Sequence, residues 1–214
     1  MNVIVLGASG GVGRHLVRLA FEQGHAVTAL ARRSDGIDLR ATVVIDDVLR
    51  AGCFEQHIGG HDIVLSALGI KRRNPANPWS VLVSPPDFCS RTAIMLIAAM
   101  RRHGARRIVA VSAAGVADSA AKMNALMKFF VTSSKVGVAY RDLALMEAAY
   151  ADSGLDWTCP RPTRLADGPL TRRVKIIDAF PLTAAISRAD VAWWMLEQTS
   201  RPAGSRRPVI TGAT

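Results

Sequence analysis

The chain has 214 residues, of which 50% are hydrophobic and 21% charged, and these proportions exclude a disordered chain and a fibre. Its three cysteines cannot form a disulfide scaffold, and no apolar stretch approaches the roughly 20 residues that span a bilayer. The net charge of +10 suggests anionic partners, but the arginine pairs are scattered along the chain, which argues against nucleic acid.

The N-terminus, Met1-Asn2, leads directly into a strand-like run without a basic and apolar leader. We therefore expect a cytoplasmic protein with no targeting segment and no membrane contact. The cysteines form no CxxC pair and are expected to be reduced core residues. His57 and His61 flank two consecutive glycines, which disfavour a helix, so we expect no metal site there.

Strand-like and helix-like segments alternate along the chain. Continuous apolar runs predict strands at residues 2–6, 26–31, 42–45, 62–66, 107–112 and 155–160. Apolar residues at helical spacing predict helices at residues 11–23, 91–103, 138–153 and 187–199. Strands that are apolar throughout are buried on both faces, and the helices between them cover those faces. The pattern predicts an α/β fold, a Rossmann-like doubly wound parallel sheet, in a single domain over residues 1–214.

Two insertions interrupt this alternation, at about residues 70–89 and 115–137. The first contains four prolines and Trp79, a composition typical of a long ordered loop. The second carries methionine and phenylalanine residues on a short expected helix, where they form either core or a lid. Both should emerge at the carboxyl edge of the sheet, and we expect them to form the walls of a substrate pocket.

The segment between the first strand and the first helix reads Gly7-Ala8-Ser9-Gly10-Gly11-Val12-Gly13, a G-x-x-G-x-x-G motif. Gly7 permits a tight turn, Gly10 lets a diphosphate approach the backbone, and Gly13 allows the helix to pack closely on the strand. The free amides and the positive dipole end of the helix then face the phosphates. All seven residues are therefore predicted to bind a dinucleotide.

The end of the second strand predicts which dinucleotide is preferred. An NAD site usually has an acidic residue there, whereas this chain has Arg32 and Arg33, and Asp35 comes too late. A guanidinium is a planar donor suited to the 2′-phosphate of NADP. We therefore expect NADP(H) to be preferred over NAD(H), with Arg32 as the main contact and Arg33 as an auxiliary.

Two further strand ends have residues compatible with the same site. Asp46-Asp47-Val48 follows the third strand, where such domains form the adenine pocket, with Asp47 and Val48 as the candidate contacts, and Ala67-Leu68-Gly69 follows the fourth, where small residues let the backbone approach a cofactor. Each segment could equally be an ordinary turn at a strand end.

With these motifs the chain resembles the atypical short-chain dehydrogenases/reductases that bind NADP, and is similar to the biliverdin-IXβ/flavin reductases and to NmrA-like proteins. The resemblance covers nearly the whole chain. It rests on residues 7–13, Arg32, Asp47-Val48, residues 66–69, VAVSA at 109–113, DSGLDWTCPRP at 152–162 and SRADVA at 187–192. It implies that Pro160, Pro162 and Thr163 lie beside the nicotinamide ring, and that Ser112 borders the reaction space as the candidate catalytic residue.

The chain departs from the wider superfamily at one important point. Many of those enzymes use a Tyr-x-x-x-Lys pair to pass a proton to a carbonyl oxygen. Here Tyr140 is followed four residues later by Ala144, and Tyr150 by Gly154. A flavin, quinone or tetrapyrrole spreads the transferred charge over a delocalised system and can take its proton from solvent, so such an acceptor suits this site.

The sequence therefore predicts an NADPH-dependent oxidoreductase that transfers hydride to a small-molecule conjugated acceptor, such as a flavin or quinone. The alternative is a non-catalytic NADP(H)-binding redox sensor of the NmrA-like type, which would act through a protein partner. An epimerase or dehydratase with tightly bound NAD is a third option, disfavoured because no acidic residue follows the second strand. The sequence does not identify the acceptor or the oligomeric state.

Overall fold

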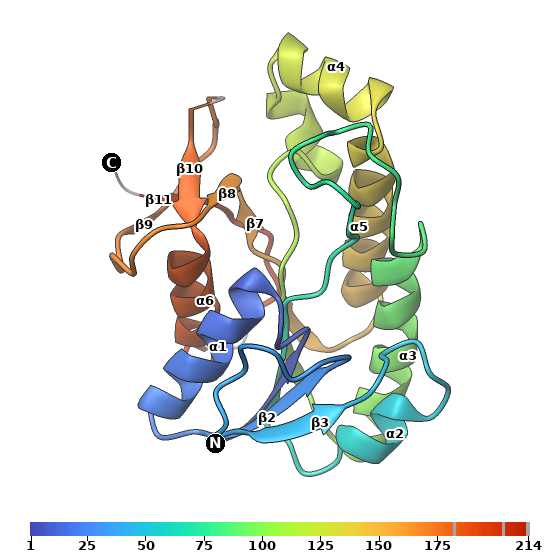
Figure 1. Ribbon diagram of the computed structural model, residues 1–214, viewed down its shortest axis with the longest axis vertical. Helices are drawn as coiled ribbons and strands as arrows, with labels where there is room; N and C mark the ends of the chain where they lie inside the picture. Colours follow the sequence, from blue (N-terminus) through green and yellow to red (C-terminus); the bar gives the residue numbers. More distant parts are fainter. Residues whose placement is uncertain (182, 203, 213–214) are drawn as a thin grey trace.

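A six-stranded sheet, all of whose strands are parallel, forms the centre of the computed structural model, which describes residues 1–181, 183–202 and 204–212 (Figure 1). The strand order is β3-β2-β1-β4-β5-β6. The strands are β1 (Asn2–Leu6), β2 (Ala26–Ala31), β3 (Thr42–Ile45), β4 (Ile63–Ser66), β5 (Arg107–Ala110) and β6 (Asp156–Thr158). The order reverses between β1 and β4, so the predicted Rossmann-like doubly wound sheet is confirmed.

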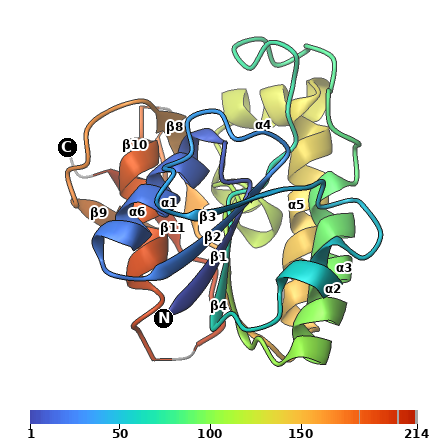
Figure 2. The ribbon, with the colours of Figure 1, turned by 60° about the horizontal axis from the view of Figure 1, so that its bottom comes forward.

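Helices cover both faces of this sheet (Figure 2). On one face lie α1 (Gly11–Glu22) and α6 (Arg188–Glu197), and on the other lie α2 (Cys53–His57), α3 (Phe88–His103) and α5 (Val136–Ala151). The apolar stripe of α1 explains its position, because Leu16 and Val17 are fully buried against the sheet. Burying one such side chain contributes about 1.5–3 kcal/mol. Two apolar cores thus enclose the inner strands, as their continuous apolar sequences predict, whereas the edge strand β3 has no buried residue and its Ile45 is 57% exposed.

The helix ends agree with the sequence signals. Gly104 follows α3 in the left-handed region, with φ of 81°, which glycine adopts without steric cost. Ser187 caps α6, because its side-chain oxygen accepts a hydrogen bond of 2.9 Å from the backbone N–H of Asp190. The carboxylate of Asp190 in turn accepts from the backbone N–H groups of Thr171 and Arg172 and so fixes the preceding loop on the helix.

The two insertions lie together beyond the carboxyl edge of the sheet (Figure 1). Residues 70–87 form an extended loop, as predicted, and α3 begins inside the predicted insertion at Phe88. The second insertion holds two helices in place of one, a 3-10 helix η1 (Ala117–Lys122) and α4 (Ala125–Ser133). The rings of Trp79 and Phe130 meet edge to face with centroids 5.9 Å apart, so the loop supports α4.

Several elements were not predicted. The chain after β6 forms β7 (Arg161–Pro162), β8 (Arg164–Ala166), β9 (Val174–Ile176), β10 (Ala185–Ser187) and β11 (Val209–Gly212). These pair as β7-β11-β9 and β10-β8. Most of these strands are only two or three residues long and include polar residues such as Arg164 and Lys175, so they lack the continuous apolar runs that marked β3 to β6, and the five-residue helix α2 is too short to show a helical period. The small sheets hold the chain after β6 against the carboxyl edge of the central sheet.

We expect Gly13→Ala to destabilise the protein by roughly 3 kcal/mol or more, since the added Cβ would lie 2.2 Å from the carbonyl oxygen of Gly7. Gly59→Ala is the matched control, because its Cβ would meet only a side-chain atom of His103 at an ordinary 3.7 Å. Urea unfolding followed by circular dichroism measures both changes. Equal stabilities for the two variants would contradict the close packing of α1 on β1.

Candidate functional site

Among the residues that the structure describes, no side chain caps the first amides of α1. Gly10 is the N-cap of the helix, and it provides no side chain to cap those amides. The first turn of α1 contains no acidic residue, so the positive end of its dipole is not neutralised locally. The turn itself is rigid, because the N–H groups of Gly7 and Ala8 both donate to the carbonyl of Leu30. This arrangement offers preorganised donors to an anion such as a diphosphate.

A cleft opens at this turn, along the carboxyl edge of the sheet. It is lined by Gly7, Ser9, Gly10, Leu30, Ala31, Arg32, Asp46, Val48, Ala67, Leu68, Gly69, Lys71, Ser84 and Phe88. The lining comes from four strand ends that are far apart in sequence and from the first insertion. The predicted residues at these strand ends therefore do lie together.

Basic groups gather at the end of the cleft beside β2. Arg32 lines the cleft and is exposed, whereas Arg33 lies outside the lining and is 3.6 Å from Asp35. Lys71 reaches the same place from the first insertion. Partial desolvation and the charges of Arg32 and Arg33 lower the pKa of Lys71. An anion bound there would relieve this repulsion.

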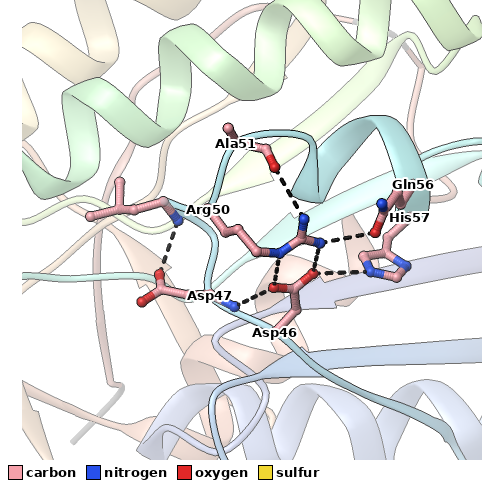
Figure 3. A network of polar contacts seen from close by, with 7 residues as sticks. Asp46, Asp47, Arg50, Ala51, Gln56 and His57 are labelled. Atoms are coloured by element: carbon pink, nitrogen blue, oxygen red, sulfur yellow. Dashed lines mark hydrogen bonds and ion pairs between the residues drawn. The ribbon is translucent and has the colours of Figure 1, made fainter.

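The turn after β3 is stabilised by Asp46, whose carboxylate binds the side chains of Arg50 and His57 (Figure 3). Hydrogen bonds from Arg50 hold the pKa of Asp46 well below its usual range. Of the predicted contacts Asp47 and Val48, this turn places only Val48 in the lining of the cleft. Val48 is buried and lines the cleft, while Asp47 lies outside the lining and accepts a hydrogen bond from the backbone N–H of Leu49 at 2.9 Å. The position that lines the cleft is Asp46.

A second cavity, of about 500 Å³, opens at the same edge beyond β5. It is mostly apolar, and its walls come from α4, α5, the first insertion and the chain after β6. It is lined by Arg72, Pro78, Ser112, Ala113, Ala114, Met127, Phe130, Val131, Val136, Tyr140, Pro162, Thr163, Arg164, Leu165, Phe180, Pro181 and Ala184. Its size and apolar walls suit a flat organic molecule. Both insertions contribute side chains to it.

Three of the residues expected near the nicotinamide line this cavity, namely Ser112, Pro162 and Thr163. Backbone hydrogen bonds hold them in place, with Ser112 N–H donating to the carbonyl of Pro160 and Ala114 N–H donating to that of Pro162. Pro160 itself is buried and contributes through this carbonyl. The remaining predicted residues outside both linings are Ala8, Gly11, Val12 and Gly13. They shape the turn and the start of α1.

A buried ion pair lies behind the cavity wall. The carboxylate of Glu147 accepts two hydrogen bonds from the guanidinium of Arg161, at 3.0 and 2.6 Å, and both side chains are only 1% exposed. Arg161 also donates to Asp118 at 2.8 Å, and Arg207 lies 3.3 Å from Glu147. Burial opposes the charge of Arg161, but its bonds to Glu147 and Asp118 prevail and raise its pKa.

The hydroxyl of Ser112 belongs to this network. Its oxygen lies 2.5 Å from a carboxylate oxygen of Glu147. Because that carboxylate is ionised against Arg161, it can only accept, so Ser112 must donate its single proton to Glu147. Ser112 therefore presents acceptor lone pairs, and no proton, to the cavity. Sequence reasoning missed Glu147 and Arg161, since no local motif reveals a pair joined across α5 and β7.

Tyr140 stands in the cavity wall without a partner lysine. Its hydroxyl donates to the carbonyl of Ala114 at 3.0 Å, and burial raises its pKa. Both effects keep the hydroxyl protonated. Ala144 occupies the position of the lysine in a Tyr-x-x-x-Lys pair. Tyr140 thus acts as a fixed wall of the cavity.

The three cysteines lie away from this chemistry, as predicted for core residues. Cys53, Cys89 and Cys159 are buried as free thiols. Burial is the main cause that raises the pKa of each thiol, for Cys53 to about 12. They therefore remain protonated and unreactive at neutral pH.

Comparison with known proteins identifies relatives of this chain. A family model described as NAD(P)H-binding matches residues 7–202. A divinyl chlorophyllide a 8-vinyl-reductase from Cucumis sativus is 28% identical over 178 residues, 76% of this chain. This chain spans only 38% of the length of that relative.

Solved structures share the fold. An anaerobilin reductase from Escherichia coli O157:H7, ChuY, has a TM-score of 0.77 at 23% identity and covers 98% of this chain and 96% of its own. The oxidoreductase ylbE from Lactococcus lactis has a TM-score of 0.78 at 17% identity, covering 100% and 92%. Across the part of the chain that the structure describes, no helix is both long and apolar enough to cross a membrane.

We expect Glu147→Gln to lower the free energy of unfolding by about 3–5 kcal/mol, because it leaves the buried charge of Arg161 without its main partner. Glu55→Gln is the control. Glu55 pairs with Arg102 at 3.2 Å on the surface, where such a pair contributes at most about 1 kcal/mol. Chemical denaturation of the two variants measures the contrast, and similar losses would show that the buried pair has no special structural role.

Proposed function

The chain belongs to the NAD(P)H-binding family, and from this premise we propose that it is an NADPH-dependent reductase of flat, conjugated acceptors. One observation carries the proposal: the polar cleft at the glycine turn and the apolar cavity open along one edge of the sheet. The two are joined in the chain as well, since Lys71 lines the cleft and the next residue, Arg72, lines the cavity. A cofactor and an acceptor can therefore lie side by side.

The residues present fit a dinucleotide. A diphosphate would bind the free amides of α1, and the closeness of the backbone there is possible only without side chains, since a Cβ on Gly10 would lie 3.1 Å from the carbonyl oxygen of Gly7. When bound, the cofactor supplies a hydride. Pro162 and Thr163 would flank the nicotinamide, as the family resemblance implies, and Ser112 would accept a hydrogen bond from its carboxamide or from the acceptor.

Arg32 and Lys71 support a preference for NADPH over NADH. Both line the end of the cleft beside β2, and no acidic residue follows that strand closely enough to bind a ribose hydroxyl. Their mutual repulsion, seen in the lowered pKa of Lys71, would be relieved by the dianionic 2′-phosphate. Lys71 thus joins the predicted Arg32 as a proposed phosphate ligand.

We expect Arg32→Ala and Lys71→Ala each to weaken NADPH binding by roughly tenfold or more, the scale of a charge-assisted hydrogen bond, and to leave NADH binding almost unchanged. Isothermal titration calorimetry with both nucleotides measures the ratio. Arg73→Ala serves as the control, because Arg73 lies in the same loop but lines neither the cleft nor the cavity. An unchanged NADPH-to-NADH ratio in both variants would refute the assignment.

The cavity favours an acceptor that needs no protein acid. The hydroxyl of Ser112 already donates its hydrogen bond to Glu147, and the hydroxyl of Tyr140 donates to the carbonyl of Ala114. Neither hydroxyl is therefore free to give a proton to the acceptor. A conjugated acceptor delocalises the two electrons that arrive with the hydride and takes its proton from water. The chain would then act mainly by orienting the two rings and by excluding water between them.

The names of two similar proteins support this choice. The Cucumis sativus relative is called a divinyl chlorophyllide a 8-vinyl-reductase, and the Escherichia coli structure is called an anaerobilin reductase. Both names describe the reduction of a conjugated organic molecule.

The test is NADPH oxidation in the presence of FMN, quinones and biliverdin, followed at the absorbance band of the reduced nicotinamide. We expect turnover with at least one acceptor above the rate without protein. Phe130→Ala, which removes part of the apolar wall, should raise KM for that acceptor several-fold while NADPH affinity is retained. Tight NADPH binding without oxidation of any acceptor would instead favour the redox sensor, acting through a protein partner.

A further inference from the structure

Two arginines stand in the wall of the otherwise apolar cavity. Arg72 comes from the first insertion and Arg164 from β8, on the chain after β6. The strand β8 and the helix α4 belong to walls on opposite sides of the sheet edge (Figure 1). Neither arginine contributes to the proposed NADPH site, so their presence in an apolar wall needs its own explanation.

Arg72 is only partly satisfied by the protein. One terminal nitrogen of its guanidinium donates to the carbonyl of Pro75 at 2.7 Å. Its Nε is buried and lacks a hydrogen-bond partner among the described residues. A buried donor without a partner costs roughly 1–3 kcal/mol, and such groups in native proteins often serve a ligand. Arg72 and Tyr140 line the same cavity.

Arg164 is likewise not neutralised. It is exposed, and within residues 1–181, 183–202 and 204–212 no carboxylate lies within 4 Å of it or of Arg72. Among the same residues, Arg32 in the cleft has no acidic partner either, whereas two other arginines nearby do. Arg161 binds Glu147, and Arg188 binds Asp167 at 2.6 Å. The cavity therefore holds two cations whose charge the protein does not balance.

We propose that the acceptor carries an anionic group, a carboxylate or a phosphate, and that Arg72 and Arg164 bind this group while the conjugated ring lies on the apolar wall. The inference rests on the proposed reductase function and adds the charge of its substrate. A guanidinium suits both anions because its planar donors match two oxygens at once. The apolar surroundings strengthen the attraction, since the local dielectric constant is lower than that of water.

Two matched pairs of molecules test the proposal. FMN and riboflavin share one ring system and differ by a phosphate, while biliverdin and its dimethyl ester differ in their carboxylates. Binding of each is titrated by fluorescence quenching of the full chain, with and without saturating NADP⁺. We expect FMN to bind at least about tenfold more tightly than riboflavin, or biliverdin more tightly than its ester, and the pair that shows the difference identifies the anion.

Variants assign the preference to the two residues. Arg72→Met and Arg164→Met should each remove most of it by weakening only the charged member of the pair, and the double variant should remove it entirely. Arg72→Lys keeps the positive charge but changes the hydrogen bond to Pro75, and it should retain part of the preference. This variant therefore separates a loss of charge from a loosening of the loop. Arg73→Met removes an equal charge from the same loop, outside the cavity, and should behave as the unaltered protein.

Equal affinities within both pairs, or a preference that survives the double variant, would overturn the proposal. These titrations measure binding and not turnover. A protein that prefers the anionic member but never oxidises NADPH would therefore support the anion site while refuting the reductase function.

Discussion

Helix α1 approaches strand β1 so closely that a side chain at Gly13 would overlap the carbonyl oxygen of Gly7. This contact sets the direction of α1, and with it the place to which its free amides and its dipole point. The sheet then brings the ends of β2, β3 and β4 to the same edge. The cleft thus follows from a backbone approach that only glycine permits, and its charged residues are added to a geometry that already exists.

The buried pair of Glu147 and Arg161 has the corresponding role for the cavity. It ties α5 to β7, two elements whose neighbouring residues line the cavity. The same carboxylate accepts the hydrogen bond that the Ser112 hydroxyl donates, so that only the oxygen lone pairs of Ser112 face the cavity. One ion pair therefore joins α5 to β7 and orients the hydroxyl of Ser112 in the cavity wall, which links the stability of the fold to the polarity of the site.

The sequence was sufficient to predict what depends on local pattern. Apolar runs and helical spacing located the six central strands and the main helices within a few residues, and the glycine motif located the turn. The site residues that the sequence did not predict are those whose roles depend on tertiary contacts. Lys71 and Glu147 carry no local signal, because their roles arise from neighbours such as Arg32 and Arg161, which lie far away in sequence. Likewise, hydrogen bonds within one turn determine that Asp46 lines the cleft and that Asp47 does not.

Helix α4, like the loop of the first insertion at residues 70–87, contains no buried residue, whereas α5 and the chain after β6 do. Met127 and Phe130 face the cavity while Leu126 and Phe129 remain exposed, so the helix shares little of the apolar core. A segment held this lightly opens at a smaller free energy than the sheet beneath it. Under the proposed reductase function, substitutions on α4 would change which acceptors enter the cavity without disturbing the dinucleotide site, so the range of acceptors could evolve independently of the rest of the protein.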